Sequence, residues 1–391
     1  MSNSFAKKLS LMTFLHFFAF GSIIPIFSLY LLRYLEFSGG QVGTILAAGA
    51  ISSIVSPFVS SFIADKLISS ERLFALAHIL GSLTMAGLYF VNEFHLVFWG
   101  YFLWKAFVGP TMGLADAIVF HHLHDRKKYG KIRVWGTFGW IFAALFFGFL
   151  IMRQSGELAY GLLLSASVSM IVGLFTLTIP VTKVVKEEKQ RLLPVASLKV
   201  LIRPQVFILV ITTMMIFFAD RFYFYGSSPY LKHIGFPEEF IMPYLSVGQL
   251  LEIVAMLSLG WLMARFRAKL VLIAGICANI LRYVLLFYSS SKLSALIAIA
   301  FHGIAYTFFF SAVFIFLDYQ VDKKNRAGVH QLFRIIYLGF GTLFGNLAAG
   351  YVKDTFDWTH FWMIPALIST LVLIILLFFP ETKKARSKQA G

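Results

Sequence analysis

Long apolar runs recur from one end of the chain to the other, and this recurrence limits the available folds more than any other feature. A helix of about 20 apolar residues crosses the roughly 30 Å hydrocarbon core of a bilayer. Strands of a membrane barrel would instead show about ten alternating residues each. The sequence therefore predicts an all-α integral membrane protein with twelve spans, at residues 10–32, 42–64, 73–91, 96–120, 133–152, 159–180, 206–230, 240–263, 270–288, 293–317, 329–352 and 359–379.

The composition also favours a membrane protein over a soluble globule. Hydrophobic residues make up 59% of the 391 residues and charged residues only 13%, which is too little polar surface to cover a soluble fold. The first apolar run is too long for the apolar region of a cleavable signal peptide. Cys277 is the single cysteine, so the chain contains no internal disulfide and no multi-cysteine metal site.

The net charge of +16 comes from basic residues that are concentrated in the loops on one side of the membrane. Of the 34 lysines and arginines, 25 fall on one side, five on the other and four within the predicted spans. Basic residues concentrate in cytoplasmic loops, so this bias places both termini and the central loop in the cytoplasm. The lipid bilayer, and not nucleic acid, is the partner that this charge pattern predicts.

The spans divide into two halves of six. We predict an N-terminal half at 1–180, a charged cytoplasmic linker at 181–205 and a C-terminal half at 206–391 that ends in a short basic tail. The segments SFIADKLISSERLFAL and GWLMARFRAKLVLI form a weak internal repeat, with Lys66 and Arg265 199 residues apart. This organisation is typical of the major facilitator superfamily, in which substrate binds between the halves near the middle of the membrane.

Ionisable residues inside the spans are candidate functional residues, because each costs a few kcal/mol to insert at the bilayer centre. The alternative is that opposite charges pair between helices and hold the bundle together, as we expect for Lys105 and Asp116. Asp220 and Arg221 are adjacent and so should point in different directions. For Asp220, pairing with Arg282 and facing a cavity both stay open. We expect His302 to be a packing residue or a ligand, and Arg334 to extend toward the membrane surface.

Glu252 differs from the other charged residues in its surroundings. It lies three residues after Gln249 on the same helical face, with no cationic residue at i±3 or i±4. Burial in a low-dielectric cavity favours the protonated form of a carboxyl group, so Glu252 is our first candidate for loading and releasing a proton.

One face of the fifth predicted span carries polar and aromatic groups. Arg133, Thr137 and Trp140 are spaced i, i+4 and i+7, which places them on the same side of a helix. Arg133 is then either an anchor in the headgroups or a ligand contact. The nearby stretch FHHLHDRKK at 120–128 could suggest a metal site, but adjacent His121 and His122 cannot easily ligate one ion from a helix. We expect no metal.

At these residues the chain resembles the nucleoside:proton symporter family of the major facilitator superfamily. The resemblance rests on YGKIRVWGTFGWI, SPFVSSFIADKLISSERLFALAHILGS, GQLLE, FHGIAYTFFF and NRAGVHQLFRIIYLGFGTLFG, which occur in the family's order over almost the whole chain. The phenylpropionate and oligosaccharide permeases form a neighbouring branch that shares the YGK[VI]R[LV]WG element.

The resemblance implies roles for several residues. It places Arg133, Thr137 and Trp140 on a substrate-facing side, together with Gln249 and Glu252. A nucleoside suits these groups, because Trp140 offers a flat surface for a base and the polar groups offer hydrogen bonds.

The chain also departs from the family pattern. Tyr225 and Ser228 stand where the family has a Gln-x-x-Asn on the seventh helix that reads the nucleoside, and Thr307 replaces an acid on the tenth. We expect all three to contact the substrate. Asp116 stands in place of an asparagine. Proton coupling would then rest on Glu252, with Asp220. The remaining candidates are His302, as a substrate contact, and an intramembrane charge network of Lys105, Asp116, Arg221 and Arg282.

The sequence thus predicts a proton-coupled nucleoside transporter in a bacterial-type inner membrane. We expect a monomer without a cofactor, driven by the proton gradient. A permease for a sugar or small aromatic acid, an uncoupled uniporter and a non-transporting receptor are the alternatives. The chain contains no HExxH or GxSxG motif, so the sequence does not predict an enzyme.

Overall fold

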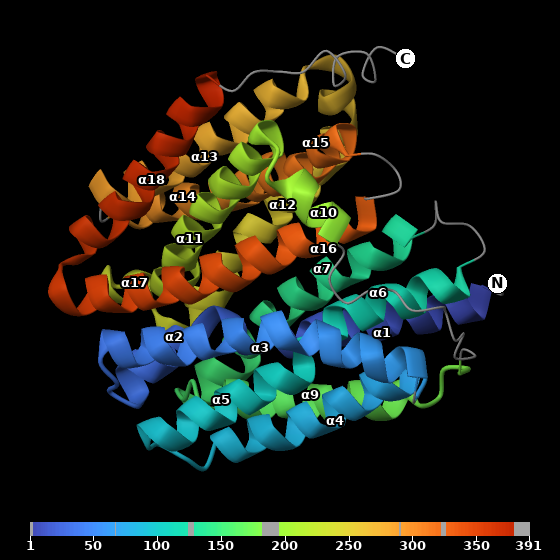
Figure 1. The fold of residues 1–391 in the computed structure, drawn as a ribbon. Coiled ribbons are helices and arrows are strands. Elements are labelled where there is room, and N and C mark those ends of the chain that lie inside the picture. The colour runs from blue at the N-terminus through green and yellow to red at the C-terminus, as the bar shows by residue number, and fades with distance from the viewer. Residues whose placement is uncertain are drawn as a thin grey trace. The chain divides into compact units, whose positions relative to one another are not determined.

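The computed structural model describes residues 3–66, 68–123, 129–181, 195–288, 291–321 and 326–378, and every regular element in these ranges is helical (Figure 1). The helices are α1 (Asn3–Gly21), η1 (Ile24–Ile26), α2 (Phe27–Leu29), η2 (Tyr30–Tyr34), α3 (Gly39–Lys66), α4 (Ser70–Leu88), α5 (Phe94–Val108), α6 (Thr111–His122), α7 (Tyr129–Phe146), η4 (Phe147–Met152), α8 (Arg153–Ser155), α9 (Tyr160–Thr176), α10 (Val195–Leu201), α11 (Pro204–His233), α12 (Glu238–Arg265), α13 (Ala268–Tyr288), α14 (Lys292–Ala305), η5 (Tyr306–Ser311), α15 (Ala312–Gln320), α16 (Arg326–Arg334), η7 (Ile335–Gly341), α17 (Thr342–Thr355) and α18 (Trp358–Phe378).

Each predicted span coincides with one helix or with a run of successive helices of this list. Within the described residues, nine stretches are long and apolar enough to cross a membrane. The other three predicted spans correspond to α3, α4 and α9, of which α9 is an apolar helix of 17 residues. The chain therefore has an all-helical, multi-pass membrane fold.

The described residues group into two compact units. The N-terminal unit contains the residues up to 181 together with Pro237–Ser246 at the start of α12, and the C-terminal unit contains 195–236 and the residues from Val247 onward. The start of α12 packs closely on η4, because Gly148 has no side chain to hold off the backbone of Glu239.

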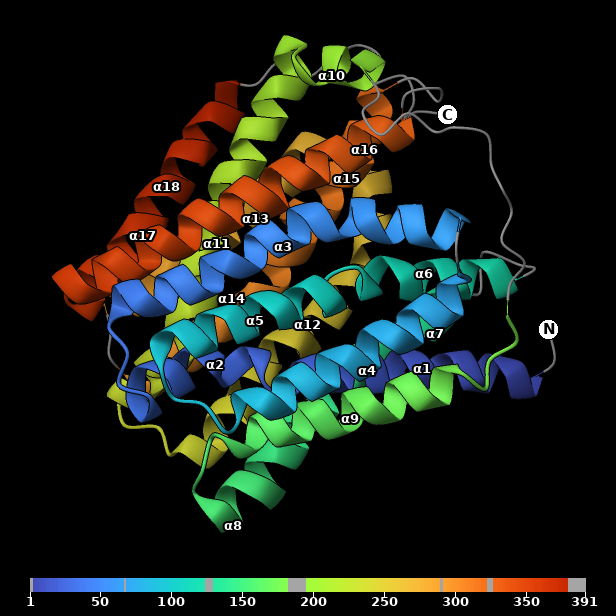
Figure 2. The same cartoon turned by 60° about the horizontal axis from the view of Figure 1, so that its bottom comes forward.

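The N-terminal unit is held together by close contacts between small residues and by hydrogen bonds between helices. α1 and α7 approach at Gly139, where a Cβ atom would overlap the carbonyl oxygen of Phe14. The Ser82 hydroxyl of α4 donates to the Ala166 carbonyl of α9 at 2.7 Å, and the two helices run side by side (Figure 2). The Ser165 hydroxyl of α9 donates to the Ala19 carbonyl of α1 at 2.7 Å.

The C-terminal unit packs α11, α13, α14 and α18 around buried aromatic and aliphatic side chains. Two polar bonds cross these helices. The Tyr230 hydroxyl donates to the Leu286 carbonyl at 3.2 Å, and the Asn279 amide donates to the Ser369 hydroxyl at 3.0 Å. These bonds fix α13 against α11 and α18, which positions the charged residues described next.

Candidate functional site

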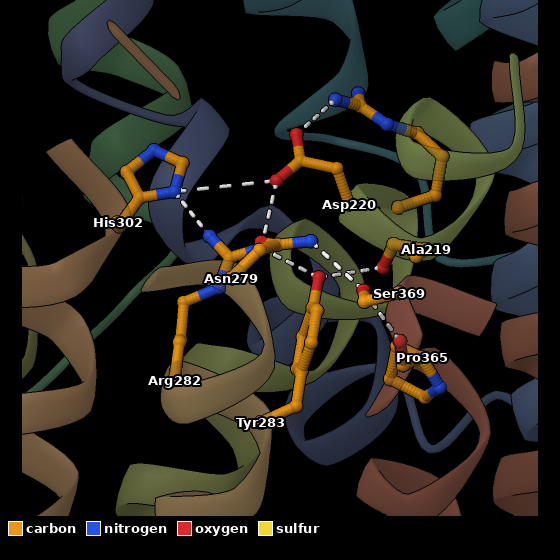
Figure 3. Close-up of polar contacts among 9 residues, drawn as sticks. Ala219, Asp220, Asn279, Arg282, Tyr283, His302, Pro365 and Ser369 are labelled. Atoms are coloured by element: carbon orange, nitrogen blue, oxygen red, sulfur yellow. Dashed lines mark hydrogen bonds and ion pairs between the residues drawn. The ribbon is translucent and has the colours of Figure 1, made fainter. Parts of the chain in front are cut away.

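A buried ion network lies in the C-terminal unit, with Asp220 of α11 as its acceptor. Asp220 is 2% exposed and Arg282 of α13 is 1% exposed. Nη2 of Arg282 donates to one carboxylate oxygen of Asp220 at 3.1 Å, as Figure 3 shows, and Nη2 of Arg221 donates to the other at 3.0 Å. Of the two sequence alternatives for Asp220, the structure shows pairing with Arg282.

The expectation that Asp220 and Arg221 point apart is wrong. The two side chains leave the helix in different directions, but the arginine side chain is long enough to fold back to the carboxylate. Its guanidinium also lies over the rings of Phe217 and Phe224, at 4.2 and 4.6 Å from the centroids. These aromatic faces help to stabilise a cation that one shared carboxylate does not fully neutralise.

Arg282 joins three helices through its planar group. Nη1 contacts Nδ1 of His302 on α14 at 2.5 Å, and Nη2 donates to the Tyr283 hydroxyl at 2.6 Å, which in turn donates to the Ala219 carbonyl at 2.8 Å (Figure 3). An arginine only donates hydrogen bonds, so Nδ1 of His302 is the acceptor and Nε2 carries the hydrogen of the neutral ring.

Aromatic stacking completes this network. The ring of Tyr223 lies parallel to His302, with centroids 4.5 Å apart and an interplanar angle of 13°. The guanidinium of Arg282 lies 4.4 Å from the centroid of the same tyrosine ring. His302 is therefore fixed on one face by stacking and at Nδ1 by a charged donor.

The predicted pair Gln249 and Glu252 lies where α12 crosses α14. A Cβ atom on Gly303 would overlap the carbonyl oxygen of Gly248 and the backbone nitrogen of Glu252, so the two backbones touch at this point. The crossing brings the Gln249–Glu252 segment of α12 against α14 beside His302. Within the described part of the chain, the buried Oε1 atom of Gln249 has no hydrogen-bond partner.

Thr307 lies about one helical turn after Gly303, inside the π-helical segment η5. Its side chain is fully buried, and its hydroxyl has no hydrogen-bond partner among the described residues. Such π-helical turns occur frequently at functional sites. Tyr225 and Ser228 are also fully buried on α11, where Tyr225 packs against Phe361 of α18. Their predicted contact with substrate stays a prediction.

In the N-terminal unit, α7 provides the helix on which Arg133, Thr137 and Trp140 share a face, and all three side chains are half-buried. The Arg133 guanidinium lies 4.2 Å from the centroid of the Phe17 ring of α1. One face of this cation is therefore covered by an aromatic ring, which limits the directions in which it can donate to a ligand.

The other two members of the predicted charge network also belong to the N-terminal unit. Lys105 lies over the rings of Trp104 and Tyr101, at 4.6 and 5.6 Å from the centroids. Asp116 accepts a hydrogen bond from the Tyr129 hydroxyl at 2.7 Å. In the C-terminal unit, Arg221 and Arg282 share Asp220.

No group of three histidine, cysteine, aspartate or glutamate side chains in the described ranges is arranged to hold a metal ion. In the histidine-rich stretch, residues 124–128 lie outside the described residues, while Nε2 of His122 contacts Glu71 at 3.1 Å.

Four buried residues in polar or aromatic contacts were not predicted from the sequence: Tyr223, Tyr283, His16 and His78. Tyr223 and Tyr283 are aromatic residues in an aromatic-rich chain and carry no distinguishing signal. His16 and His78 did carry one, because each is a polar residue inside an apolar run, the same criterion that selected Asp220 and Arg282.

Comparison with known proteins is consistent across the whole chain. The family model described as "Nucleoside H+ symporter" matches residues 2–384. The chain is 27% identical to the putative nucleoside transporter YegT of Escherichia coli K12, covering 96% of this chain and 94% of that one. It is 26% identical to the xanthosine permease of the same organism, covering 96% of each. The crystal structure of the nucleoside transporter NupG has the same fold, with a TM-score of 0.87 and 23% identity over 97% of this chain and 99% of the other.

These matches run the length of the chain and agree with the helical membrane fold. A family of transporters, and not of enzymes, accounts for them. The chain belongs to the nucleoside H+ symporter family of the major facilitator superfamily.

Proposed function

We propose that this protein takes up nucleosides together with protons by alternating access. In this proposal twelve helices span the cytoplasmic membrane of a bacterium, with both termini in the cytoplasm. The 25-to-5 distribution of basic residues and the coincidence of each predicted span with a helix support this topology.

The observation that carries the proposal is the crossing of α12 and α14, where the backbone of Glu252 meets Gly303, the residue after His302. Glu252 is half-buried, and Gln249 offers a carbonyl oxygen that no described residue occupies. We assign Gln249 and His302 to hydrogen bonds with the nucleoside and Glu252 to the proton. From the N-terminal unit we assign Arg133 and Thr137 to polar contacts and Trp140 to stacking on the base.

Asp220 has a different role in this proposal. Both of its carboxylate oxygens accept from arginines, so a proton on Asp220 would weaken two buried ion pairs. We therefore assign Asp220 to holding α11 and α13 together, and we assign coupling to Glu252.

Glu252→Gln tests this assignment. The variant keeps the size and hydrogen-bonding capacity of the side chain but cannot release a proton. We expect it to lose accumulation of labelled uridine against a gradient, while exchange of uridine across the membrane stays measurable. Glu239→Gln, near the start of the same helix, is the matched control and should accumulate uridine normally. Normal accumulation by Glu252→Gln would exclude Glu252 as the coupling group.

An uncoupled uniporter is the second candidate, and Thr307 is the observation that favours it. The hydroxyl group of threonine neither gains nor loses a proton at physiological pH. The position that carries an acid in the family therefore cannot carry a transported proton here. Uridine uptake that persists in a protonophore would establish the uniporter.

A further inference from the structure

Two buried histidines contact each other in the N-terminal unit, outside the groups assigned to nucleoside binding. His16 of α1 and His78 of α4 are fully buried, with Nδ1 of His16 2.9 Å from Nε2 of His78. On its other side, Nε2 of His16 lies 3.3 Å from the Met112 sulfur of α6. Nδ1 of His78 has no hydrogen-bond partner among the described residues.

The positions of these residues in the N-terminal half correspond to those of the ion network in the C-terminal half, when the spans of each half are counted in order. Helices α1, α4 and α6 carry residues of the first, third and fourth predicted spans of the N-terminal half. Asp220, Arg282 and His302 lie on the first, third and fourth spans of the C-terminal half. In each half, a buried polar contact therefore links the first and third spans and involves a residue of the fourth.

The hydrogen atoms of the pair leave one acceptor position open. If Nε2 of His78 donates to Nδ1 of His16, Nε2 of His16 can donate to the Met112 sulfur, which only accepts. The remaining nitrogen, Nδ1 of His78, then has a lone pair to which no described group donates a hydrogen bond. A proton added there gives an imidazolium whose N–H···N bond to His16 becomes charge-assisted, which makes it roughly twice as strong as the neutral bond.

Access and electrostatics decide when the pair takes up this proton. If the hydrogens lie the other way, Nδ1 of His16 donates to Nε2 of His78, and Nε2 of His16 is the open acceptor. Met112 is 45% exposed and covers this nitrogen, so movement of one flexible side chain admits a proton there. Arg133 of α7 is a neighbouring cation. It lies over Phe17, whose ring is edge-on to His16 with centroids 5.1 Å apart. Like charges repel, so the Arg133 cation opposes a positive charge on the pair.

Two other charged residues on neighbouring helices are held by their own contacts. Lys105 of α5 lies over Trp104, and Asp116 of α6 accepts from Tyr129. Arg133 is therefore the charge that a ligand can change. An acceptor atom of the substrate on Arg133 offsets part of its field at His16, so substrate binding and proton uptake favour each other.

We propose that the His16–His78 pair is a second proton-binding site, which loads one proton as substrate occupies Arg133. The proposal rests on the proposed nucleoside–proton symport. The chain would then have a second proton-carrying group, in the N-terminal unit. Such a group would compensate for Thr307, which stands in the C-terminal unit where the family has an acid.

The test is the number of protons moved per nucleoside, measured in proteoliposomes from the uridine gradient that a known proton gradient sustains. His16→Gln and His78→Gln keep hydrogen-bonding groups but cannot hold the proton. Each should lower the stoichiometry by about one proton per uridine, because binding of the two ligands is linked. His95→Gln removes an exposed histidine of the same unit that lies outside the pair, so it is the control and should keep the wild-type stoichiometry.

Wild-type stoichiometry in both histidine variants would overturn the proposal. Uridine transport by the wild-type protein that ignores the proton gradient would instead contradict the proposed function itself. If either variant fails to fold, nitrogen-15 NMR of histidine-labelled wild-type protein decides, because coupling across the N–H···N bond identifies the pair. Imidazolium signals that appear on adding uridine at mildly acidic pH support the site, and a pair that stays neutral under these conditions excludes it.

Discussion

Arg282 links three helices of the C-terminal unit through one flat group. Its terminal nitrogens contact Asp220 on α11, His302 on α14 and Tyr283 on its own helix. A guanidinium presents five donors in a fixed plane, whereas a lysine has one compact ammonium group. The geometry therefore specifies arginine, and the wholly buried Asp220 depends on it.

Removing this side chain should destabilise the protein more than removing its neighbour. Arg282→Met leaves Asp220 with one cation and deprives His302 of its donor, and breaking a buried pair in this way costs about 3 to 5 kcal/mol. Arg221→Met should lower the melting temperature less, because Arg221 is partly exposed and Asp220 keeps Arg282. Thermal unfolding in detergent, followed by tryptophan fluorescence, compares the two. Equal losses would mean that Arg282 has no special role as a link.

The sequence identified the charged members of this network but not their geometry. Asp220 and Arg282 were recognisable because charge inside an apolar run is costly. The contact of Arg282 with His302, and the return of Arg221 to Asp220, depend on helix rotation. In a membrane the lipid-facing and protein-facing sides are both apolar, so periodicity does not define that rotation.

At the scale of helices, the crossing of α12 and α14 depends on the absence of a side chain. Gly303 lies directly against the α12 backbone, and on the other side Gly248 lies against the Ile299 carbonyl, 2.9 Å from where its Cβ atom would be. Backbone atoms cannot move aside as a flexible side chain can. Any larger residue at Gly303 must push the two helices apart at the point where Gln249 and Glu252 meet α14.

Gly303→Ala should therefore lower uridine transport by at least tenfold, since small displacements of binding groups weaken transport strongly. Gly260→Ala on α12 is the matched control, because a Cβ atom there meets no atom within 4 Å. Initial uptake rates, normalised to the amount of protein in the membrane, give the comparison. An unchanged rate in Gly303→Ala would show that the close crossing is not needed for transport.

The elements themselves were largely predictable. The seventh predicted span at 206–230 corresponds to α11 at Pro204–His233, and the other spans agree to within several residues at each end. The short helix α10 inside the predicted linker was missed, because seven residues are too few to show a helical apolar period. The π-helical segments also carried no recognisable sequence signal.

At the scale of the whole molecule, the asymmetry of basic residues predicts the orientation in the membrane. Lys353 lies at the end of α17 on the side with few basic residues, and Arg203 precedes α11 on the side with many. In a Cys277→Ser background, Lys353→Cys should react with a membrane-impermeant thiol reagent added to intact cells, and Arg203→Cys should react only after lysis. Reversed labelling would contradict the cytoplasmic position of the termini.

The whole molecule is proposed to couple nucleoside uptake to the proton gradient, and transport into cells measures this coupling. Labelled uridine and adenosine are supplied to cells that lack their own nucleoside carriers, with and without a protonophore. We predict uptake of both nucleosides that collapses when the proton gradient is removed. A protein that reaches the membrane but takes up neither nucleoside would contradict it.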